Sequence, residues 1–415
     1  MRRNVRRRRA ALAAFFAVMG PGIITGFAGN DAGGVATYTA AGARFGFSLL
    51  WLLLIASLSL VVVQEMCARM GAVTGKGLSD LIRERFGVRW TILAMLALFI
   101  SNASNVVAEY AGIAASMGLV GVPPWVSVPV AGLVVWALIV FASYKLVERA
   151  LFALILAFVA YPISIAILRP DWSAVARGFV PTQPADPAVL AMALALVGTT
   201  VTPYMLFYLQ ASVVDKGIDR ESFGLARLDA VMGATLSGLF AFFIVVVAGA
   251  VLFPAGLPAD TAEQAAQALR PLAGDAAGFL FGVGLLAASL LGLTVMPLST
   301  SYAICEAFGW ESGISKDFGD APVFMGLVTF LIAAGGAIVL LVPQQQLLPL
   351  IIVSQAVNGL LLPIVLVFIM RLASDPSVMG ADANGRVRGI LGWGVAGLTG
   401  SLSVAYLVAR ALGIG

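Results

Sequence analysis

Apolar runs of membrane-crossing length alternate with short polar connectors along almost the whole chain. A helix needs about 20 predominantly apolar residues to cross the hydrocarbon core of a bilayer. Eleven runs meet this requirement, at roughly 10–42, 47–71, 90–116, 126–144, 147–168, 187–214, 229–254, 276–307, 322–342, 346–371 and 388–412. The pattern predicts an all-α polytopic membrane protein.

Composition supports this fold class and excludes others. The 415 residues are 60% hydrophobic and only 11% charged, whereas soluble domains carry about 25% charged residues. The apolar runs leave no room for a soluble domain, and no enzyme motif or cofactor site is evident. Cys67 and Cys305 lie in apolar runs without the spacing of a metal clamp. Histidine is absent, which removes the usual proton carrier near neutral pH.

The positive charges predict an orientation. Residues 1–9 form a basic tail, which we interpret as a retained, lipid-facing flank rather than a signal peptide or a nucleic-acid-binding arm. If this tail is cytoplasmic, most of the 25 Lys and Arg residues lie inside. The exceptions are Arg44, Arg169, Arg177, Arg270 and Arg410. The positive-inside rule therefore predicts a cytoplasmic N-terminus, and we expect a bacterial or archaeal plasma membrane.

Two runs are interrupted in mid-membrane. Run 10–42 contains GPG at 20–22 and GFAGNDAGG at 26–34, and run 187–214 contains VGTTVTPY at 197–204. Each opens a set of five spans, which predicts inverted repeats over 10–168 and 187–371, followed by an eleventh helix at 388–412. The alternative is that Gly and Pro merely kink these helices, which membrane proteins tolerate.

Asp31 is an ionisable group inside the first interruption. A carboxylate at mid-depth costs about 2.5–3.5 kcal/mol on insertion scales, and such residues mark ion or substrate pathways. Unwound carbonyls such as that of Ala28, with Thr199, Thr202 and Gln355, would form the oxygen-rich site that hard divalent cations prefer. The alternative is that Asp31 only caps the half-helix that starts near Gly33.

The sequence resembles the natural resistance-associated macrophage protein (Nramp) family of divalent metal transporters over essentially its whole length. The resemblance runs through GPG at 20–22, DAGG at 31–34 and QEMCARMGAVTGK at 64–76. It implies a LeuT-like fold of two inverted five-helix repeats plus an eleventh transmembrane helix. It also implies that the first and sixth spans hold the metal.

The chain departs from the family signatures at the implied metal site. Asp31 matches the acid of the first-span signature Asp-Pro-Gly-Asn, but Gly34 occupies the place of the ligand Asn. Thr202, Pro203 and Tyr204 replace the sixth-span Met-Pro-His. A hydroxyl instead of a thioether favours magnesium, calcium or manganese. Lost bulk also suggests a wider cavity for a partly hydrated ion, because Mg²⁺ sheds water reluctantly.

The pattern therefore looks like that of the Nramp-related magnesium transporters. We expect a transporter for Mg²⁺, which also carries Mn²⁺, by alternating access and without proton coupling. The rival predictions are a proton-coupled Mn²⁺ or Fe²⁺ importer and a Na⁺-coupled carrier of an organic solute. The oligomeric state stays open.

Three further polar residues could lie along an ion path. The family's metal transporters carry an Asp three residues before the acid that matches Glu109, but here that residue is Val106. Glu109 either faces a water path or is a buried carboxyl bonded to a neighbour such as Asn105. Glu65 either pairs with Arg69 at i+4 or lines an exit path.

Overall fold

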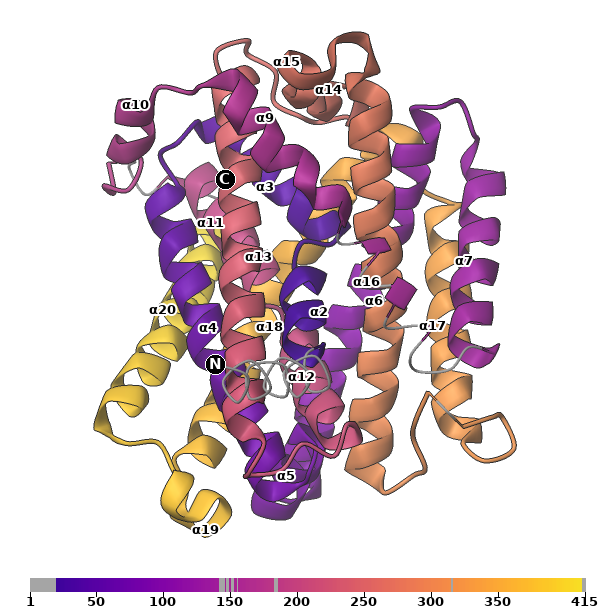
Figure 1. The fold of residues 1–415 in the computed structure, drawn as a ribbon, viewed down its shortest axis with the longest axis vertical. Coiled ribbons are helices and arrows are strands. Elements are labelled where there is room, and N and C mark those ends of the chain that lie inside the picture. Colours follow the sequence, from indigo (N-terminus) through magenta and orange to yellow (C-terminus); the bar gives the residue numbers. More distant parts are fainter. Residues whose placement is uncertain are drawn as a thin grey trace, which may run out of the picture.

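The computed structural model describes residues 20–141, 146, 149–150, 153–154, 156–182, 186–314 and 316–412, and within these ranges all regular structure is helical. Figure 1 shows the helices running along one long axis as a single bundle. Short helices α5 (Leu78–Phe86) and α19 (Pro376–Met379) lie at one end of this bundle, and α10 (Trp172–Arg177), α14 (Ala262–Ala266) and α15 (Arg270–Ala273) lie at the other.

The first predicted repeat contains a broken helix followed by long ones. The broken helix comprises α2 (Pro21–Ala28) and α3 (Ala32–Phe45). The helices that follow are α4 (Leu50–Thr74), α6 (Val88–Gly118), α7 (Pro124–Phe141) and α9 (Ala160–Leu168), the last preceded by the 3₁₀ turn η1 (Leu156–Val159). Most of the connection between α7 and η1 falls outside the described residues, as do residues 1–19 with the basic tail.

The second predicted repeat has the same plan. Its broken helix comprises α11 (Pro187–Thr200) and α12 (Pro203–Asp215). The helices that follow are α13 (Phe223–Val251), α16 (Ala277–Phe308), α17 (Pro322–Val339) and α18 (Leu347–Ala373). The last helix of the chain is α20 (Arg386–Ala411).

The two broken helices run in opposite directions. In Figure 1 the chain passes from α2 upward into α3, whereas it descends from α11 into α12. The sequence predicts both breaks, and the structure places them at residues 29–31 and 201–202. Pro203 begins α12 because proline suits the first turn of a helix, where its missing N–H costs no hydrogen bond.

Glycines let the broken helix of the first repeat approach the second repeat closely. A side-chain carbon on Gly22 would collide with the backbone of Ala230 in α13, and one on Gly26 would collide with Gly233. Small residues at such crossings allow helix backbones to pack without a hydrophobic driving force from lipid. Asp229, also on α13, accepts a hydrogen bond of 2.6 Å from the backbone N–H of Gly22. Helix α2 is therefore fixed to α13 by backbone contact and by a buried carboxylate.

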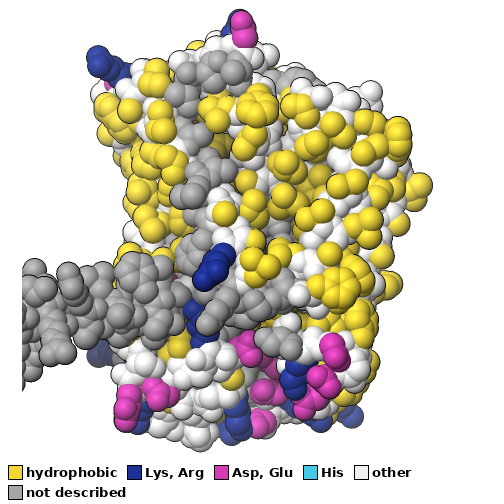
Figure 2. Space-filling model, turned by 45° about the vertical axis from the view of Figure 1, so that its right-hand side comes forward, with side chains coloured by type: hydrophobic (Ala, Val, Ile, Leu, Met, Phe, Trp, Pro, Cys, Tyr) yellow, Lys and Arg dark blue, Asp and Glu magenta, His cyan; other side chains and the backbone are white. Residues whose placement is uncertain are grey.

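The outer surface matches a bilayer. Figure 2 shows hydrophobic side chains over the flank of the molecule and charged side chains gathered at the lower end, where α5 and α19 lie in Figure 1. Within the described residues, nine helical stretches are long and apolar enough to cross a membrane, α11 and α12 counting together as one. Two predicted spans remain. The first is the broken pair α2 and α3, and the second is α9, for which part of the predicted run lies outside the described residues.

Candidate metal ion site at the paired helix breaks

Asp31 caps the helix that follows the first break. Its backbone is extended, and its Oδ1 accepts a hydrogen bond of 2.8 Å from the N–H of Gly34. The side chain is buried, with 1% of its surface exposed. Asp31 is therefore the N-cap of α3. A cap uses one lone pair, so the carboxylate keeps capacity for a cation.

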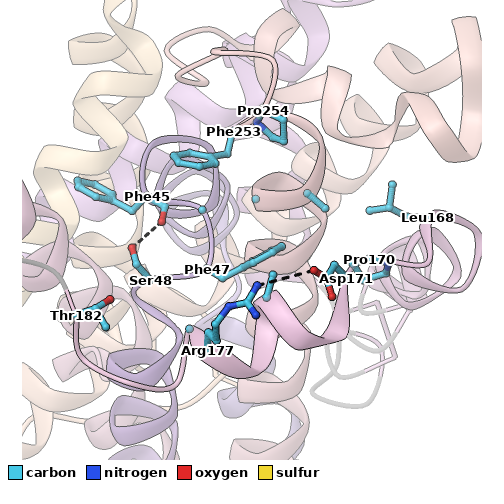
Figure 3. Close-up of a pocket in the computed structure, with 15 residues that line it drawn as sticks. Phe45, Phe47, Ser48, Leu168, Pro170, Asp171, Arg177, Thr182, Phe253 and Pro254 are labelled. Atoms are coloured by element: carbon cyan, nitrogen blue, oxygen red, sulfur yellow. Dashed lines mark hydrogen bonds and ion pairs between the residues drawn. The ribbon is translucent and has the colours of Figure 1, made fainter.

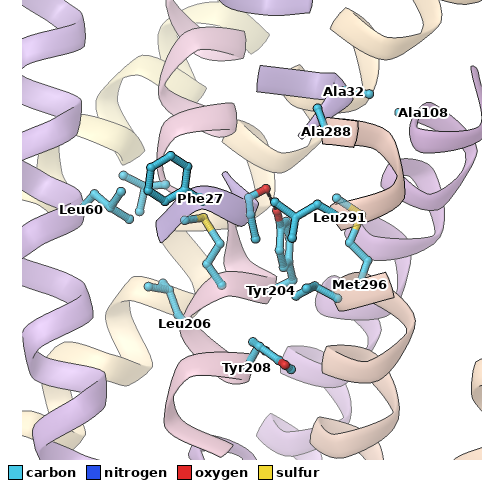
Figure 4. Packing of buried hydrophobic residues seen from close by; sticks show 14 of the residues in the cluster. Phe27, Ala32, Leu60, Ala108, Tyr204, Leu206, Tyr208, Ala288, Leu291 and Met296 are labelled. Carbon is cyan, nitrogen blue, oxygen red and sulfur yellow. Dashed lines mark hydrogen bonds between the residues drawn. The ribbon is translucent and has the colours of Figure 1, made fainter. Parts of the chain in front are cut away.

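The second break meets the first through Tyr204, in the first turn of α12. Its hydroxyl oxygen lies 2.6 Å from the carbonyl oxygen of Ala28 and 3.0 Å from Oδ2 of Asp31. Figure 4 shows this ring among packed apolar side chains, with Phe27 and Leu291 on either side. Sequence reasoning singled out Ala28 and Asp31 for the site, but noted Tyr204 only as the residue in place of the signature His and gave it no role. Its position directly after Pro203, at the start of a half-helix, could have indicated a role in the site, because half-helix starts point toward the central binding site in transporters with broken helices.

The two predicted hydroxyl ligands lie at the second break and are fully buried. Thr199 belongs to the last turn of α11, and Thr202 is the residue before α12. The Thr199 hydroxyl finds no hydrogen-bond partner among the described residues. A buried polar group without a partner costs free energy unless a ligand or water satisfies it. Thr199 is thus available to an ion or its hydration shell.

Gln355 on α18 lies against the start of α3. A side-chain carbon on Gly33 would collide with the amide nitrogen of Gln355. The same amide donates to Asn105 Oδ1 at 3.2 Å, and its oxygen accepts from Asn358 at 2.9 Å. Gln355 therefore bonds across helices and also borders the first break. Asn105 belongs to this neutral network between α6 and α18.

Gly34 does not open the wider cavity that its small size suggested. A side-chain carbon there would lie 2.5 Å from the carbonyl oxygen of Gly29 and 3.4 Å from the ring of Tyr38. The space beside Gly34 is therefore filled by the backbone of the first break. The expectation of extra room at this position is wrong, because the Gly29 carbonyl occupies the space. A methionine that sequence reasoning missed also borders the break, since a side-chain carbon on Gly29 would lie 3.1 Å from the sulfur of Met205.

Glu109 of α6 brings a second carboxyl to the start of α3. Its Oε2 accepts a hydrogen bond of 3.2 Å from the N–H of Ala32, the residue after Asp31. Its side chain is fully buried, and its carboxyl carbon fills the space beside Gly292 of α16. The suggestion that Glu109 bonds to Asn105 is wrong, because the Asn105 amide instead donates to Asn358 at 3.0 Å. Two acids thus converge on one helix N-terminus, where backbone N–H groups favour negative charge.

Glu65 lies in an arginine cluster at the lower end of the bundle. Its Oε1 is 3.5 Å from Nε of Arg69, 3.3 Å from Nε of Arg227 and 3.8 Å from a terminal nitrogen of Arg388. The predicted pair with Arg69 is therefore present and belongs to a larger set that joins α4, α13 and α20. These contacts favour the ion-pair interpretation over an exit-path acid.

The candidate site is closed to solvent. Asp31, Thr199, Thr202, Gln355 and Glu109 are each at most 1% exposed.

One open pocket of about 590 Å³ lies elsewhere, where the ends of α3 and α13 meet α10 (Figure 3). It is lined by Phe45, Phe47 and Phe253, with Asp171 and Arg177 at its edge, and contains none of the predicted site residues.

Within the described residues, no three His, Cys, Asp or Glu side chains are grouped so that they could bind one ion. A transported ion must leave again, so a site with one or two carboxyls and neutral oxygens suits transient binding. The fold and this site define a membrane transporter with a LeuT-like architecture, built on two inverted repeats that each begin with a broken helix.

Sequence comparison specifies the family. The model of natural resistance-associated macrophage protein-like (Nramp) proteins matches residues 22–409, so the chain belongs to the Nramp family. The divalent metal cation transporter MntH of Ralstonia nicotianae is 32% identical over 404 residues, covering 90% of this chain and 86% of the relative. MntH of Deinococcus radiodurans is 29% identical, covering 95% and 90%. The protein is a divalent metal cation transporter and an integral membrane protein.

Solved structures support the architecture. The manganese transporter of Eremococcus coleocola aligns with a TM-score of 0.78 at 21% identity, covering 95% of this chain and 86% of that one. Mhp1, a nucleobase-cation-symport transporter, aligns with a TM-score of 0.56 at 15% identity, covering 95% and 91%. These similarities concern the fold. The predicted all-α, LeuT-like fold is confirmed.

Proposed function

We propose that this transporter carries Mg²⁺, and Mn²⁺ less selectively, as a partly hydrated ion and without proton coupling. The observation that carries the proposal is the position of Asp31. Its carboxylate lies at the first break, and Tyr204 joins it to the second break and to the carbonyl of Ala28. A divalent cation here would meet oxygen atoms from both repeats, which is the donor set that Mg²⁺ and Mn²⁺ prefer.

The proposed ligand set keeps the predicted residues in different roles. Asp31 supplies charge, the Ala28 carbonyl supplies a neutral oxygen, and Thr199 and Thr202 bind the ion or its retained water. Gln355 borders the site and acts through water. Gly34 contributes its backbone N–H to Asp31, rather than space for the ion.

The absence of proton coupling rests on the neutral character of the neighbouring network. Val106 stands where the family's metal transporters carry an acid, and the adjoining Asn105, Asn358 and Gln355 exchange hydrogen bonds without a titratable group. An inside-negative potential is worth about 4.6 kcal/mol per 100 mV for a divalent ion, from 2.3 per unit charge. Uptake therefore proceeds without a driving proton.

A second candidate is a proton-coupled Mn²⁺ importer. The relatives are named MntH, and the Eremococcus coleocola protein is described as a manganese transporter. Glu109 also favours this candidate, because a second buried carboxyl beside Asp31 could take up a proton. The sulfur of Met205 near Gly29 is a softer atom at the edge of the site. In this case Glu109, with Asn105, would line a proton path.

Proteoliposomes that contain a metal-sensitive dye or a pH-sensitive dye separate the two candidates. We expect Mg²⁺ and Mn²⁺ to enter down their gradients without acidification of the lumen, and metal-dependent acidification would refute uncoupled transport. Asp31→Ala abolishes flux in both candidates. Asp31→Ser is the sharper variant, since serine caps a helix but carries no charge. If Asp31→Ser transports like the wild type, Asp31 is only a cap and the site lies elsewhere.

The predicted topology and domain limits remain part of the proposal. A cytoplasmic N-terminus places α5 and α19 inside, with the arginine cluster around Glu65, and places α10 outside. The repeats then extend over 10–168 and 187–371, with the tail at 1–9 and the last helix at 388–412. Labelling of a cysteine introduced at Lys76 or at Thr182 in intact cells tests this orientation, because only the second is then reached from outside and the native Cys67 and Cys305 are buried.

A further inference from the structure

Tyr204 contacts the two oxygens that the proposed function assigns to the cation. Its hydroxyl oxygen is 2.6 Å from the Ala28 carbonyl oxygen and 3.0 Å from Asp31 Oδ2. A phenol carries one proton and can donate it to one acceptor at a time. Two acceptors therefore share one donor, and the same lone pairs are those that a divalent ion would use.

The backbone and the packing hold the ring in this position. Tyr204 is fully buried in the first turn of α12, and Ser299 of α16 donates a hydrogen bond of 2.9 Å to its carbonyl oxygen. Figure 4 shows Leu291 and Met296 beside the ring. This burial and the Ser299 hydrogen bond hold the Tyr204 hydroxyl between the two helix breaks, where it contacts Asp31.

Asp31 needs a partner at each stage of a transport cycle. After an ion has left, a carrier without proton coupling must return to its starting conformation with this carboxylate still in the protein interior. An unpartnered buried carboxylate is costly, and a donor that forms a charge-assisted hydrogen bond reduces that cost. Among the residues that the structure describes, the N–H groups of Gly34 and Gly33 and the hydroxyl of Tyr204 reach Asp31.

We infer that Tyr204 is a positioning residue that replaces the departing cation at Asp31 and Ala28, and so permits the return step of the transport cycle. This inference rests on the proposed function, because it assumes that the ion binds at Asp31 and that no proton neutralises it. When the ion leaves, Tyr204 donates its one proton to either of the two oxygens, one at a time, and it gives up both contacts when the next ion binds. The Tyr204 hydroxyl thus affects the rate of the return step rather than the affinity for the ion.

Two flux measurements on the same proteoliposomes test this role. Net uptake into metal-free liposomes requires the return step, whereas exchange of external ⁵⁴Mn²⁺ for internal Mn²⁺ does not. We expect Tyr204→Phe to lower net uptake about tenfold, corresponding to about 1.4 kcal/mol on the return barrier. Exchange should stay within about twofold of the wild type, since the ring and the ion ligands remain.

Tyr302→Phe is the matched control. Tyr302 is a buried tyrosine whose hydroxyl lies 3.2 Å from a carboxylate oxygen of Asp215, near the lower end of α16. We expect this variant to leave the ratio of exchange to net uptake unchanged. If Tyr204→Phe lowers both fluxes equally, or neither, the inference is wrong while the ion site survives. If Asp31→Ser retains both fluxes, the proposed function itself fails.

Discussion

Gly34→Ala is predicted to destabilise the protein before it changes ion preference. The added methyl group would lie 2.5 Å from the Gly29 carbonyl oxygen, well inside van der Waals contact, and the obstacle is backbone rather than a flexible side chain. The first break must therefore shift. Such overpacking costs about 1–3 kcal/mol. Because Gly29 and Gly34 flank Asp31, the same shift displaces the carboxylate.

Gly284→Ala provides the matched control. Gly284 lies inside α16, and a side-chain carbon there meets no atom within 4 Å. Alanine in a helix interior is favoured over glycine by about 0.5–1 kcal/mol, so this variant should be as stable as the wild type or slightly more stable.

The assay compares thermal unfolding midpoints in detergent with Mn²⁺ flux in liposomes. Detergent-solubilised unfolding is commonly irreversible, so the variants are compared at one heating rate. We expect Gly34→Ala to melt at a lower temperature than Gly284→Ala and to lose most of its flux. If Gly34→Ala keeps wild-type stability and flux, then the packing of Gly29 on Gly34 does not position Asp31. Gly34→Asn combined with Thr202→Met should fail for the same steric reason, rather than shift the preference toward softer metals.

Three further predictions concern residues away from the ion. Asp229→Ala should lower the unfolding midpoint by the equivalent of about 1–3 kcal/mol, because the buried N–H of Gly22 loses its acceptor; equal midpoints would contradict this. Glu65→Gln should destabilise by about 3 kcal/mol, since it removes the carboxylate that three arginines share; the loss should shrink at high salt, and a salt-independent midpoint would refute it. The hydroxyl and N–H of Ser377 donate hydrogen bonds to Asp375 and lower the pKa of its carboxyl in the folded protein. The ionised Asp375 therefore stabilises the fold at pH values above its pKa in the unfolded chain, and this stabilisation is lost as the pH falls through its pKa in the folded protein. Ser377→Ala should therefore lower the midpoint at pH 7 but not near pH 3, and a pH-independent difference would exclude this linkage.

The spans and the breaks could be predicted because their cause is local. A run of about 20 apolar residues is a helix in lipid regardless of its neighbours, since its backbone groups must bond within the segment. The predicted ends lie close to those of helices such as α4 and α18. Asp31 was equally visible, because a carboxylate in an apolar run stands out without any tertiary information.

The partners of these groups could not be predicted, because they come from distant segments. Glu109 meets the N–H of Ala32 across 77 residues, and nothing near Glu109 in the sequence indicates that contact. The role of Gly34 was misjudged because the sequence does not show that the Gly29 carbonyl lies in the space beside it.

The sequence by itself determined the membrane class, the approximate limits of long helices such as α4 and α18, and the presence of an acid at a helix break. These follow from hydropathy and backbone chemistry, which act within one segment. Only the tertiary structure decided that Tyr204 joins Ala28 to Asp31, because that junction requires α2, α3 and α12 to meet at one point. The place where they meet is set by helix packing through small residues. The sequence of one helix does not show which surface of another helix it will contact.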